Sequence, residues 1–240
     1  MSKSRSVAKY FRECLDSDSK LIGAAVGSGI SSRHLLAGGA DFLLIASGGM
    51  FRTAGVPSLG AYLPMGNANE IILEPAIRQI MPRAGGKPVI VGLSPTDPRH
   101  DWKELLRRVA DAGLDGVNNF PSIGFYEGPL RQTLERAGYC FDREAEFIAE
   151  ASRLGLFTLP FVYSEMDARR MAEAGADAIC ANLHFPLDSS SAATGAVGVD
   201  EVSFVFTRMF EAASRVNPGI YKLFYCAGPI STPDDLDAVA

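Results

Sequence analysis

The sequence predicts an α/β fold in which helices alternate with the strands of a parallel sheet. One short phrase occurs three times, each time after a helical pattern and before an apolar run: Gly39-Ala40-Asp41-Phe42, Gly113-Leu114-Asp115-Gly116 and Gly175-Ala176-Asp177-Ala178. A glycine in this place ends a helix in a left-handed conformation, and the next residues turn the chain into a buried strand. Each interval between the phrases has room for two helix–strand units.

Seven apolar runs bounded by turn residues are predicted to be strands. They lie at residues 20–26, 41–46, 88–93, 116–120, 157–163, 177–182 and 220–226. Their period is that of a TIM (β/α)8-type barrel, which carries its active site at the C-terminal ends of the strands. The eighth strand is missing, supplied from elsewhere, or hidden in a long connection. We treat residues 1–240 as a single TIM-barrel domain.

Capping residues place the helices between these strands. Asn67 has the capping-box partner Glu70, and Asp101 has Glu104. Helices are therefore predicted at 31–37, 67–80, 101–112, 142–154, 164–174, 201–216 and from 232 onward, with a partly helical stretch in 121–138. An amphipathic helix within residues 1–18 is expected to cover the bottom of the barrel. The connection 47–66 is predicted to be a long loop, and loops of this length are usually functional.

Composition excludes several classes of protein. With 47% hydrophobic residues, the 240-residue chain can bury one large core. No apolar run approaches the roughly 18 residues that span a bilayer, and no secretory signal is evident, so no membrane partner is expected. A net charge of −5 without a basic stripe argues against nucleic acid as a partner. Four widely spaced cysteines without a C-x-x-C pair indicate reduced thiols and a cytoplasmic location.

Two glycine-containing turns at predicted strand ends are candidates for binding an anion. Gly27-Ser28 precedes a helix, where backbone N–H groups can hold an anion, and simple turn geometry is the equally good alternative. Gly228 and Ser231 follow the seventh strand, where many barrels bind phosphate. Ordinary helix capping is the alternative for the second turn.

The loop after the second strand begins with Ser47-Gly48 and carries Arg52. A guanidinium in such a loop can bind a carboxylate or a phosphate through two parallel hydrogen bonds. A solvated loop arginine is the alternative. We therefore place Ser47 and Gly48 among the anion-binding candidates and Arg52 among the catalytic ones.

Four further polar residues lie at or near strand ends. Asp97 precedes a proline, which is also a common way to start a turn. Asn118 and Asn119 lie inside a strand, where asparagine is uncommon, and buried amides need partners. His184 is the one histidine expected at a strand end, so it is a candidate for proton transfer.

These residues are expected to converge on one cavity, although they lie far apart along the chain. Asn119 would orient the substrate, and Asp97 or His184 would carry the proton. The set is rich in amides and hydroxyls, which suits a small oxygen-rich anion. The sequence shows no metal-ligand spacing, no phosphate-binding Walker loop and no G-x-S-x-G nucleophile motif.

Several segments together resemble the phosphoenolpyruvate hydrolase-like family of TIM-barrel proteins over residues 20–240. The most specific ones are SGGMFRTAG at 47–55, SLG at 58–60, LPMGNAN at 63–69, TDP at 96–98 and NFPSIG at 119–124. The resemblance implies an enzyme acting on a small phosphorylated or carboxylated C3-type acid by hydrolysis or by cleavage of a C–C or P–C bond. Related barrels that handle phosphoenolpyruvate and phosphonopyruvate use Mg²⁺, which makes Mg²⁺ a candidate cofactor by resemblance only, with no ligand assigned.

The chain departs from the family pattern at several strand ends. Cys226-Ala227 stands where the family tends to have His-Gly, Ala46 replaces an asparagine, and His184 matches the family's histidine only with a shift of the loop. These departures leave a non-catalytic small-anion-binding or regulatory module as an alternative to an enzyme. A third alternative is a structural partner in a larger assembly, because an open barrel edge can pair with another chain. A homo-oligomer is expected.

Overall fold

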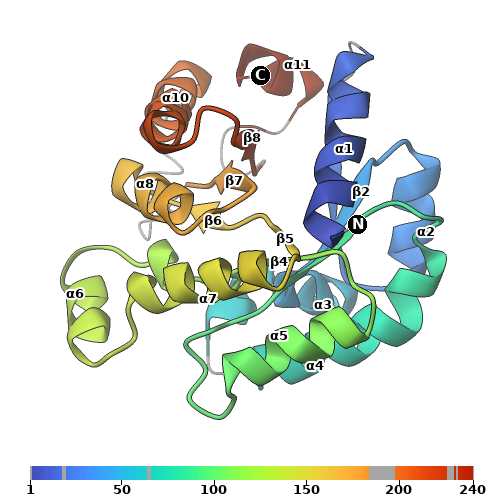
Figure 1. Ribbon diagram of the computed structural model, residues 1–240, viewed down its shortest axis with the longest axis horizontal. Coiled ribbons are helices and arrows are strands. Elements are labelled where there is room, and N and C mark those ends of the chain that lie inside the picture. The colour runs from blue at the N-terminus through green and yellow to red at the C-terminus, as the bar shows by residue number, and fades with distance from the viewer. Residues whose placement is uncertain are drawn as a thin grey trace.

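The computed structural model describes residues 2–17, 20–63, 66–183, 198–225, 230 and 232–239, and it confirms the predicted α/β organisation (Figure 1). Every strand pair is parallel. The strands are β1 (Gly23–Val26), β2 (Phe42–Ile45), β3 (Val89–Gly92), β4 (Gly116–Asn118), β5 (Phe157–Thr158), β6 (Phe161–Val162), β7 (Ala178–Ala181) and β8 (Tyr221–Phe224). Each lies inside one of the seven predicted runs, and the fifth run contains both β5 and β6.

The strands form two sheets, in the orders β1-β2-β3-β4-β5 and β6-β7-β8. The fifth predicted strand is divided at Pro160, whose nitrogen has no hydrogen to donate to a ladder. Within the described residues no ladder joins β8 to β1, and neither long connection, 47–66 or 121–138, contains a strand. The hidden-strand explanation of the missing eighth strand is therefore wrong for those two segments.

The three repeated phrases have a structural explanation. Their glycines have the positive φ angles predicted for helix ends, 101° at Gly39, 80° at Gly113 and 83° at Gly175. Each aspartate then accepts a hydrogen bond from the backbone N–H of a neighbouring strand segment: Asp41 from Ile22, Asp115 from Val89 and Asp177 from Thr158, at 2.9–3.0 Å. The phrase thus ends a helix and fixes the alignment of adjacent strands at their N-terminal ends.

The N-terminal helix α1 (Lys3–Asp16) lies against these same N-terminal ends (Figure 1). It offers one donor to each aspartate of the repeat: Lys3 Nζ to Asp115 (2.7 Å), Ser4 Oγ to Asp177 (2.7 Å) and Tyr10 Oη to Asp41 (3.3 Å). The ring of Phe11 is fully buried and packs against Phe42, Phe157 and Tyr221. The helix predicted within residues 1–18 therefore covers the end of the sheet opposite to the expected site.

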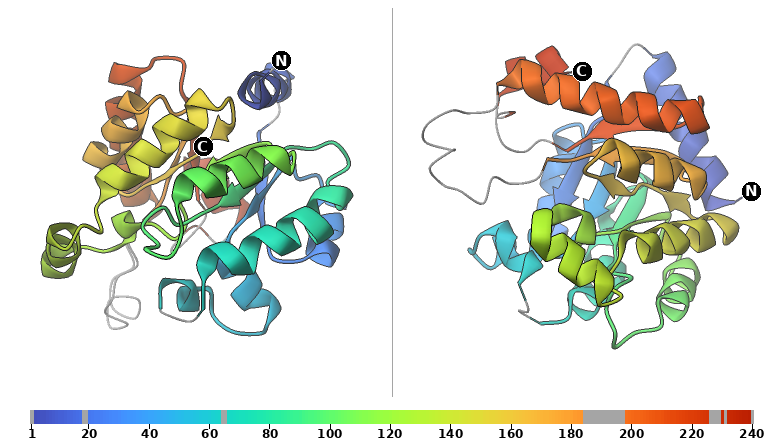
Figure 2. Two further views of the ribbon diagram at one scale, coloured as in Figure 1. Left: turned by 60° about the horizontal axis from the view of Figure 1, so that its bottom comes forward. Right: turned by 90° about the vertical axis from the view of Figure 1, so that its left-hand side faces the viewer.

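Helices cover the outside of the strands (Figure 2). The helix α8 (Glu165–Glu173) packs on both α7 (Phe141–Arg153) and α10 (Val199–Val216), and α10 also packs on α11 (Pro233–Val239). The further helices are α2 (Gly29–Ala37), α4 (Ala68–Pro75), α5 (Trp102–Asp111) and α6 (Gly128–Arg136). Asn67 and Asp101 cap α4 and α5 as predicted, and Thr232 bonds to Asp235 at the start of α11.

The connection 47–66 is more ordered than predicted, because it contains α3 (Ser47–Thr53) and the 3₁₀ turn η1 (Ser58–Tyr62). The first turn of α3 lies directly on the end of β1. A Cβ atom added to Gly49 would lie 2.3 Å from the carbonyl oxygen of Val26, and one added to Gly27 would lie 2.0 Å from that of Gly49. Only glycine allows this close approach of two backbones, so the glycines belong to a helix-packing contact rather than to a flexible loop.

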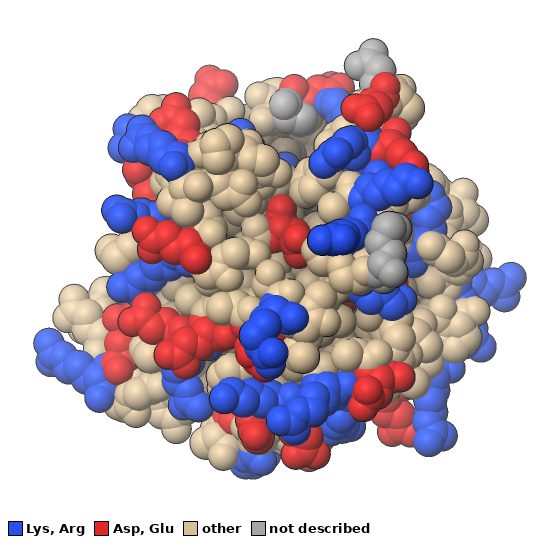
Figure 3. Space-filling view, in the orientation of Figure 1, with Lys and Arg blue, Asp and Glu red and all other residues tan. Residues whose placement is uncertain are grey.

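Two sets of apolar side chains alternate along the strands. In β2, Leu43 and Ile45 face the helices, whereas Phe42 and Leu44 belong to a second core on the other face of the sheet, which is rich in aromatic rings. On the face shown in Figure 3, acidic and basic side chains are interspersed. Within the described ranges no helix is long and apolar enough to span a bilayer.

Candidate functional site

A cavity of about 350 Å³ lies beyond the C-terminal ends of the strands, where the sequence places the site. We call it the aromatic cavity, because five rings line it together with three polar side chains: Tyr62, Phe120, Phe125, Phe161, Tyr225, Arg52, Ser58 and Asn182. These residues come from the segments that follow β2, β4, β7 and β8, and from β6 itself. The cavity therefore brings together five stretches that are far apart in the sequence.

Arg52 is the one cationic residue among the described residues that line the aromatic cavity. It lies in the last turn of α3, and its guanidinium donates hydrogen bonds to the hydroxyl oxygen of Ser58 (2.7 Å) and to the carbonyl oxygen of Ala25 (3.4 Å). Both partners are neutral, and no described carboxylate lies within ion-pair distance of it. The positive charge at the cavity is therefore positioned but not neutralised.

Asn182 adds a hydrogen-bond donor to the same cavity. It follows β7 and is 7% exposed, and its Oδ1 accepts a hydrogen bond from the N–H of Leu183 at 2.9 Å. No described residue accepts a hydrogen bond from its Nδ2. An amide N–H and a guanidinium at one cavity are suited to bind a carboxylate or another oxygen-rich group.

The rings form a connected wall. Tyr62 stacks on Phe125 with centroids 3.9 Å apart and meets Phe120 edge-on at 5.2 Å. The hydroxyl of Tyr62 lies 3.2 Å from that of Tyr163, and Tyr126 donates a hydrogen bond to the Tyr62 carbonyl oxygen. Burial raises the pKa of Tyr62 above its ordinary value, so this hydroxyl stays protonated at neutral pH.

Asp97 lines a second cavity of about 370 Å³, which also includes Ser94, Thr96, Arg99 and Tyr62. Tyr62 is thus shared by the two cavities, whereas Arg52 lines only the first and Asp97 only the second. The expectation that Arg52 and Asp97 converge on one cavity is therefore wrong in this structure. The loops that carry them are adjacent but face different hollows.

The Asp97 carboxylate is fully engaged by its neighbours. Its Oδ1 accepts hydrogen bonds from the backbone N–H and the guanidinium of Arg99, and its Oδ2 lies 3.0 Å from Nδ1 of His100 and 3.3 Å from Nδ2 of Asn69. Burial alone would raise the pKa of Asp97, but these hydrogen bonds outweigh it and hold the pKa below the usual value. Such a carboxylate stays ionised and ties the loop after β3 to α4, which does not match the proton-transfer role predicted for it.

Asn118 and Asn119 each bond to the neighbouring strand segment, but Oδ1 of Asn118 is buried and has no hydrogen-bond partner among the described residues. Nδ2 of Asn118 donates to the carbonyl oxygen of Leu159 (2.6 Å). The amide of Asn119 bonds to both backbone groups of Phe161, accepting from its N–H (2.7 Å) and donating to its carbonyl oxygen (3.2 Å). Both asparagines are fully buried, and neither lines the aromatic cavity, so their contacts in this structure are structural and the substrate-binding roles stay predictions. Asn119 acts as an extra peptide group that continues the ladder beyond Pro160.

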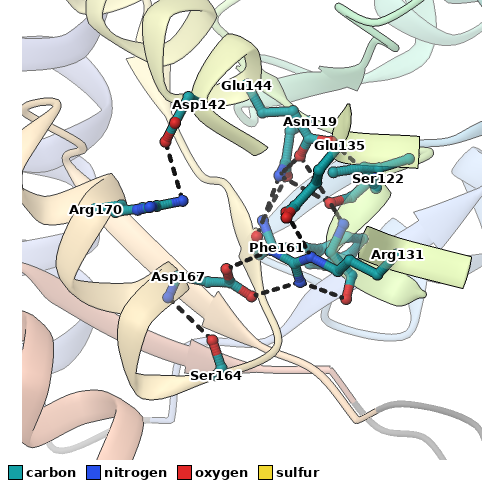
Figure 4. A network of polar contacts seen from close by, with 12 residues as sticks. Asn119, Ser122, Arg131, Glu135, Asp142, Glu144, Phe161, Ser164, Asp167 and Arg170 are labelled. Carbon is teal, nitrogen blue, oxygen red and sulfur yellow. Dashed lines mark hydrogen bonds and ion pairs between the residues drawn. The ribbon is translucent and has the colours of Figure 1, made fainter. Parts of the chain in front are cut away.

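Figure 4 shows Asn119 in a buried polar network that also contains Glu144 of α7. One oxygen of Glu144 accepts from Asn119 Nδ2 (2.6 Å) and Ser122 Oγ (2.7 Å), and the other accepts from the N–H of Ile123 (2.6 Å). Complete burial raises the pKa of Glu144 to about 8, although the three donors act in the opposite direction. The network fixes the segment 119–124, which leads directly to Phe125 in the aromatic cavity.

Gly27 and Ser28 have structural explanations, so the plain-turn alternative is the one that this structure supports. Gly27 allows the contact with α3 described above. The Ser28 side chain accepts a hydrogen bond from the N–H of Ser31, and the Ser31 hydroxyl lies 3.2 Å from the N–H of Ser28, which is a complete capping box for α2. The anion-binding role predicted for Gly27 and Ser28 is corrected accordingly.

Replacing Ser28 with alanine tests this correction. We expect the free energy of unfolding to fall by about 1 kcal/mol, the usual effect of losing an N-cap, because the N–H of Ser31 loses its acceptor. The affinity for small anions should not change. Urea unfolding and calorimetric titration of the variant measure the two quantities, and a loss of anion binding at unchanged stability would restore the anion-site interpretation.

The remaining predicted residues are divided between the described and undescribed parts of the chain. Gly48 lines the aromatic cavity. Ser47 is buried at the start of α3, and its Oγ has no hydrogen-bond partner among the described residues. His184, Gly228 and Ser231 lie outside the described residues.

The described residues do not fit a magnesium site. Mg²⁺ is held mainly by carboxylates and water in near-octahedral geometry. No described residue that lines the aromatic cavity carries a carboxylate, and Asp97 uses both oxygens for Arg99, His100 and Asn69. The described ranges also contain no group of three His, Cys, Asp or Glu residues that could hold a metal ion.

Asn182, Ser58 and the ring residues line the aromatic cavity, although the sequence did not lead to a site role for any of them. Asn182 is visible at the end of a predicted strand and Ser58 lies inside a family-like segment, so a signal existed for both. The rings gave no such signal, because aromatic residues in loops and strands are usually read as core. Their common cavity depends on the loop conformations after four different strands.

Comparison with known proteins identifies relatives over nearly the whole chain. The model of a family described as phosphoenolpyruvate hydrolase-like matches residues 6–240. Two tomato (Solanum lycopersicum) proteins are similar. The ToMV susceptible protein tm-1(GCR26) is 35% identical over 95% of this chain and 30% of its own length. The ToMV resistance protein Tm-1(GCR237) is 34% identical over 98% of this chain and 31% of its own length. The chain thus spans about a third of the length of these relatives.

Solved structures with the same fold are more distant in sequence. Phosphoenolpyruvate phosphomutase from Streptomyces platensis subsp. rosaceus is 14% identical with a TM-score of 0.57, over 91% of this chain and 80% of its own. A phosphonopyruvate hydrolase in complex with oxalate and Mg²⁺ is 15% identical with a TM-score of 0.55. The match covers 100% of this chain and 83% of the hydrolase chain. At this level of identity the likeness shows the fold alone.

Proposed function

This chain belongs to the phosphoenolpyruvate hydrolase-like family, and we propose that it is an enzyme acting on a small acid of the phosphoenolpyruvate type. The finer part of the proposal is the reaction, which is hydrolysis or cleavage of a C–C or P–C bond in a phosphorylated or carboxylated C3-type acid. The observation that carries the proposal is Arg52, a cation at a cavity beyond the strand ends that has no carboxylate partner among the described residues.

In this proposal each polar group of the aromatic cavity has a distinct task. Arg52 binds the carboxylate of the acid and stabilises negative charge that develops during bond cleavage. The amide N–H of Asn182 donates to a second oxygen of the substrate. Phe120 and Phe161, which are 8% and 2% exposed, exclude water from one side of the site. His184, two residues after Asn182 in the sequence, stays the candidate for proton transfer.

Kinetics with defined acids test the proposal. Purified protein is incubated separately with phosphoenolpyruvate and phosphonopyruvate, and released phosphate and pyruvate are measured in parallel with and without added Mg²⁺. We expect turnover of at least one acid that does not require the added metal. Absence of both turnover and binding with each acid contradicts the proposed substrate class.

A non-catalytic anion-binding module is the second candidate, and one observation favours it. The described residues that line the aromatic cavity include no Asp, Glu, His or Lys, so apart from the hydroxyls of Tyr62, Tyr225 and Ser58 they supply no group for proton transfer. Calorimetry separates the two candidates, because a module binds the acid with a measurable heat but releases no product. We also propose a homo-oligomer, since β1 and β8 each pair on one side only within the described chain, and light scattering tests it.

A further inference from the structure

The charge of the aromatic cavity limits which acids it can bind. Among its described lining residues Arg52 provides the single full charge, and Asn182 provides a neutral donor. A phosphorylated C3 acid carries a phosphate of about −1.5 to −2 charge in addition to its carboxylate. One guanidinium balances one carboxylate, and burial of the remaining negative charge against aromatic rings is costly. The described charges therefore match a monocarboxylate better than a phosphorylated acid.

The walls of the cavity are built for an apolar body. The stack of Phe125 on Tyr62 continues through Phe120 to Phe161, whose centroids are 6.0 Å apart, and from Phe161 to Tyr225 at 5.4 Å. These ring edges and faces favour contact with another planar ring. A cavity of about 350 Å³ also lies in the range that holds ligands larger than a three-carbon acid.

We propose that the aromatic cavity takes a C3-type monocarboxylate whose third carbon carries an aromatic or large apolar group, in place of a phosphate. The carboxylate lies at Arg52, the oxygen on the second carbon accepts from the Asn182 amide, and the apolar group packs on the wall formed by Tyr62, Phe120 and Phe125. This inference rests on the proposed function for the location of the site and for the C3 acid. It adds that the site selects an aromatic or large apolar group on the third carbon.

Calorimetric titration with three acids tests the inference: pyruvate, phenylpyruvate and phosphoenolpyruvate. We expect phenylpyruvate to bind about 10- to 100-fold more tightly than pyruvate, because burial of one phenyl group increases the binding affinity by about this factor. Phosphoenolpyruvate should bind more weakly than phenylpyruvate, because its phosphate loses hydration against the rings without a second cation to balance it.

Variants of the wall separate selection by the rings from nonspecific binding. Phe125→Ala should remove most of the preference for phenylpyruvate over pyruvate, because the phenyl group loses its contact with this ring. Phe204→Ala is the matched control, because Phe204 is 66% exposed on α10 and does not line the cavity. Ala25→Leu is a second, independent variant that narrows the cavity and should exclude phenylpyruvate before pyruvate. Thermal melts of each variant show that it is folded.

The outcomes distinguish this inference from the proposed function. The inference fails when phosphoenolpyruvate binds as tightly as phenylpyruvate, or when neither Phe125→Ala nor Ala25→Leu changes phenylpyruvate binding. Turnover of phosphoenolpyruvate or phosphonopyruvate without phenylpyruvate binding supports the proposed function and overturns the inference. Phenylpyruvate binding that depends on Phe125, without turnover of any acid, supports the inference and contradicts the proposed enzyme.

Discussion

Replacing Arg52 with alanine is expected to lower kcat/KM for the acid substrate by about 100- to 1,000-fold, the usual loss when one charged donor to the reacting group is removed. The reason is that Arg52 holds the only full charge among the described residues of the aromatic cavity. Its two partners, Ser58 and the Ala25 carbonyl, are neutral, so the guanidinium keeps its attraction for an anion. For a non-catalytic module, the same variant should lower the affinity for the acid.

Two further variants make the Arg52 result interpretable. Arg52→Lys keeps the charge but cannot form two parallel hydrogen bonds, so we expect an intermediate loss. Arg12→Ala is the matched control, because Arg12 is exposed on α1 at the opposite end of the sheet. Equal activity of Arg52→Ala and Arg12→Ala would show that Arg52 is a solvated loop arginine, which is the alternative that its sequence context also allows.

The regular elements of the fold could be predicted because their signals are local. The three glycine-aspartate phrases mark helix ends and strand starts, and all three glycines have the expected positive φ angles. Capping by Asn67 and Asp101 depends on residues two or three positions away, so it too is visible in the sequence. The order within 47–66 was missed, because α3 is stabilised by the contact of Gly49 with Gly27 across two elements and not by a helical pattern of its own.

The candidate site was harder to predict, because its geometry depends on which way each side chain points. Consecutive residues of a strand point to opposite faces, yet both Asn118 and Asn119 bond to the segment at 159–161 instead of entering the cavity. Asp97 lies at a strand end, as a catalytic residue would, but Arg99 and His100 satisfy it locally. Residue type and position alone could not show these partners. Arg52 lines the aromatic cavity, and the catalytic role predicted for it stays a prediction.

The family-like segment NFPSIG illustrates how a functional-looking motif can have a structural role. Asn119, Ser122 and the N–H of Ile123 all bond to Glu144, which lies on a different element. Gly124 is required by packing, since an added Cβ would lie 2.6 Å from the ring of Tyr163. The motif thus supplies Phe120 to the lining of the aromatic cavity and positions Phe125, and its other residues have structural roles.

Replacing Glu144 with alanine is expected to lower the free energy of unfolding by about 3–5 kcal/mol, since several buried donors lose their acceptor at roughly 1–3 kcal/mol each. The donors are Asn119, Ser122 and the backbone of Ile123 (Figure 4). Glu146→Ala is the matched control on the same helix, because Glu146 is exposed and should change stability by less than about 0.5 kcal/mol. Urea unfolding followed by circular dichroism measures both variants.

The same carboxyl group should make stability depend on pH. The pKa of Glu144 is raised from 4.5 to about 8 by burial, so the folded protein binds one more proton than the unfolded chain between these values. The stabilisation that comes from protonated Glu144 is therefore complete below about pH 4.5 and is lost as the pH rises through 8. Over this range the free energy of unfolding falls by at most about 1.4 kcal/mol per pH unit. Glu144→Gln, which cannot ionise, should show a flatter profile than the wild type between pH 5 and about 8. A wild-type stability that instead rises over this range relative to Glu144→Gln would mean that the hydrogen bonds from Asn119, Ser122 and Ile123 outweigh burial and keep Glu144 ionised.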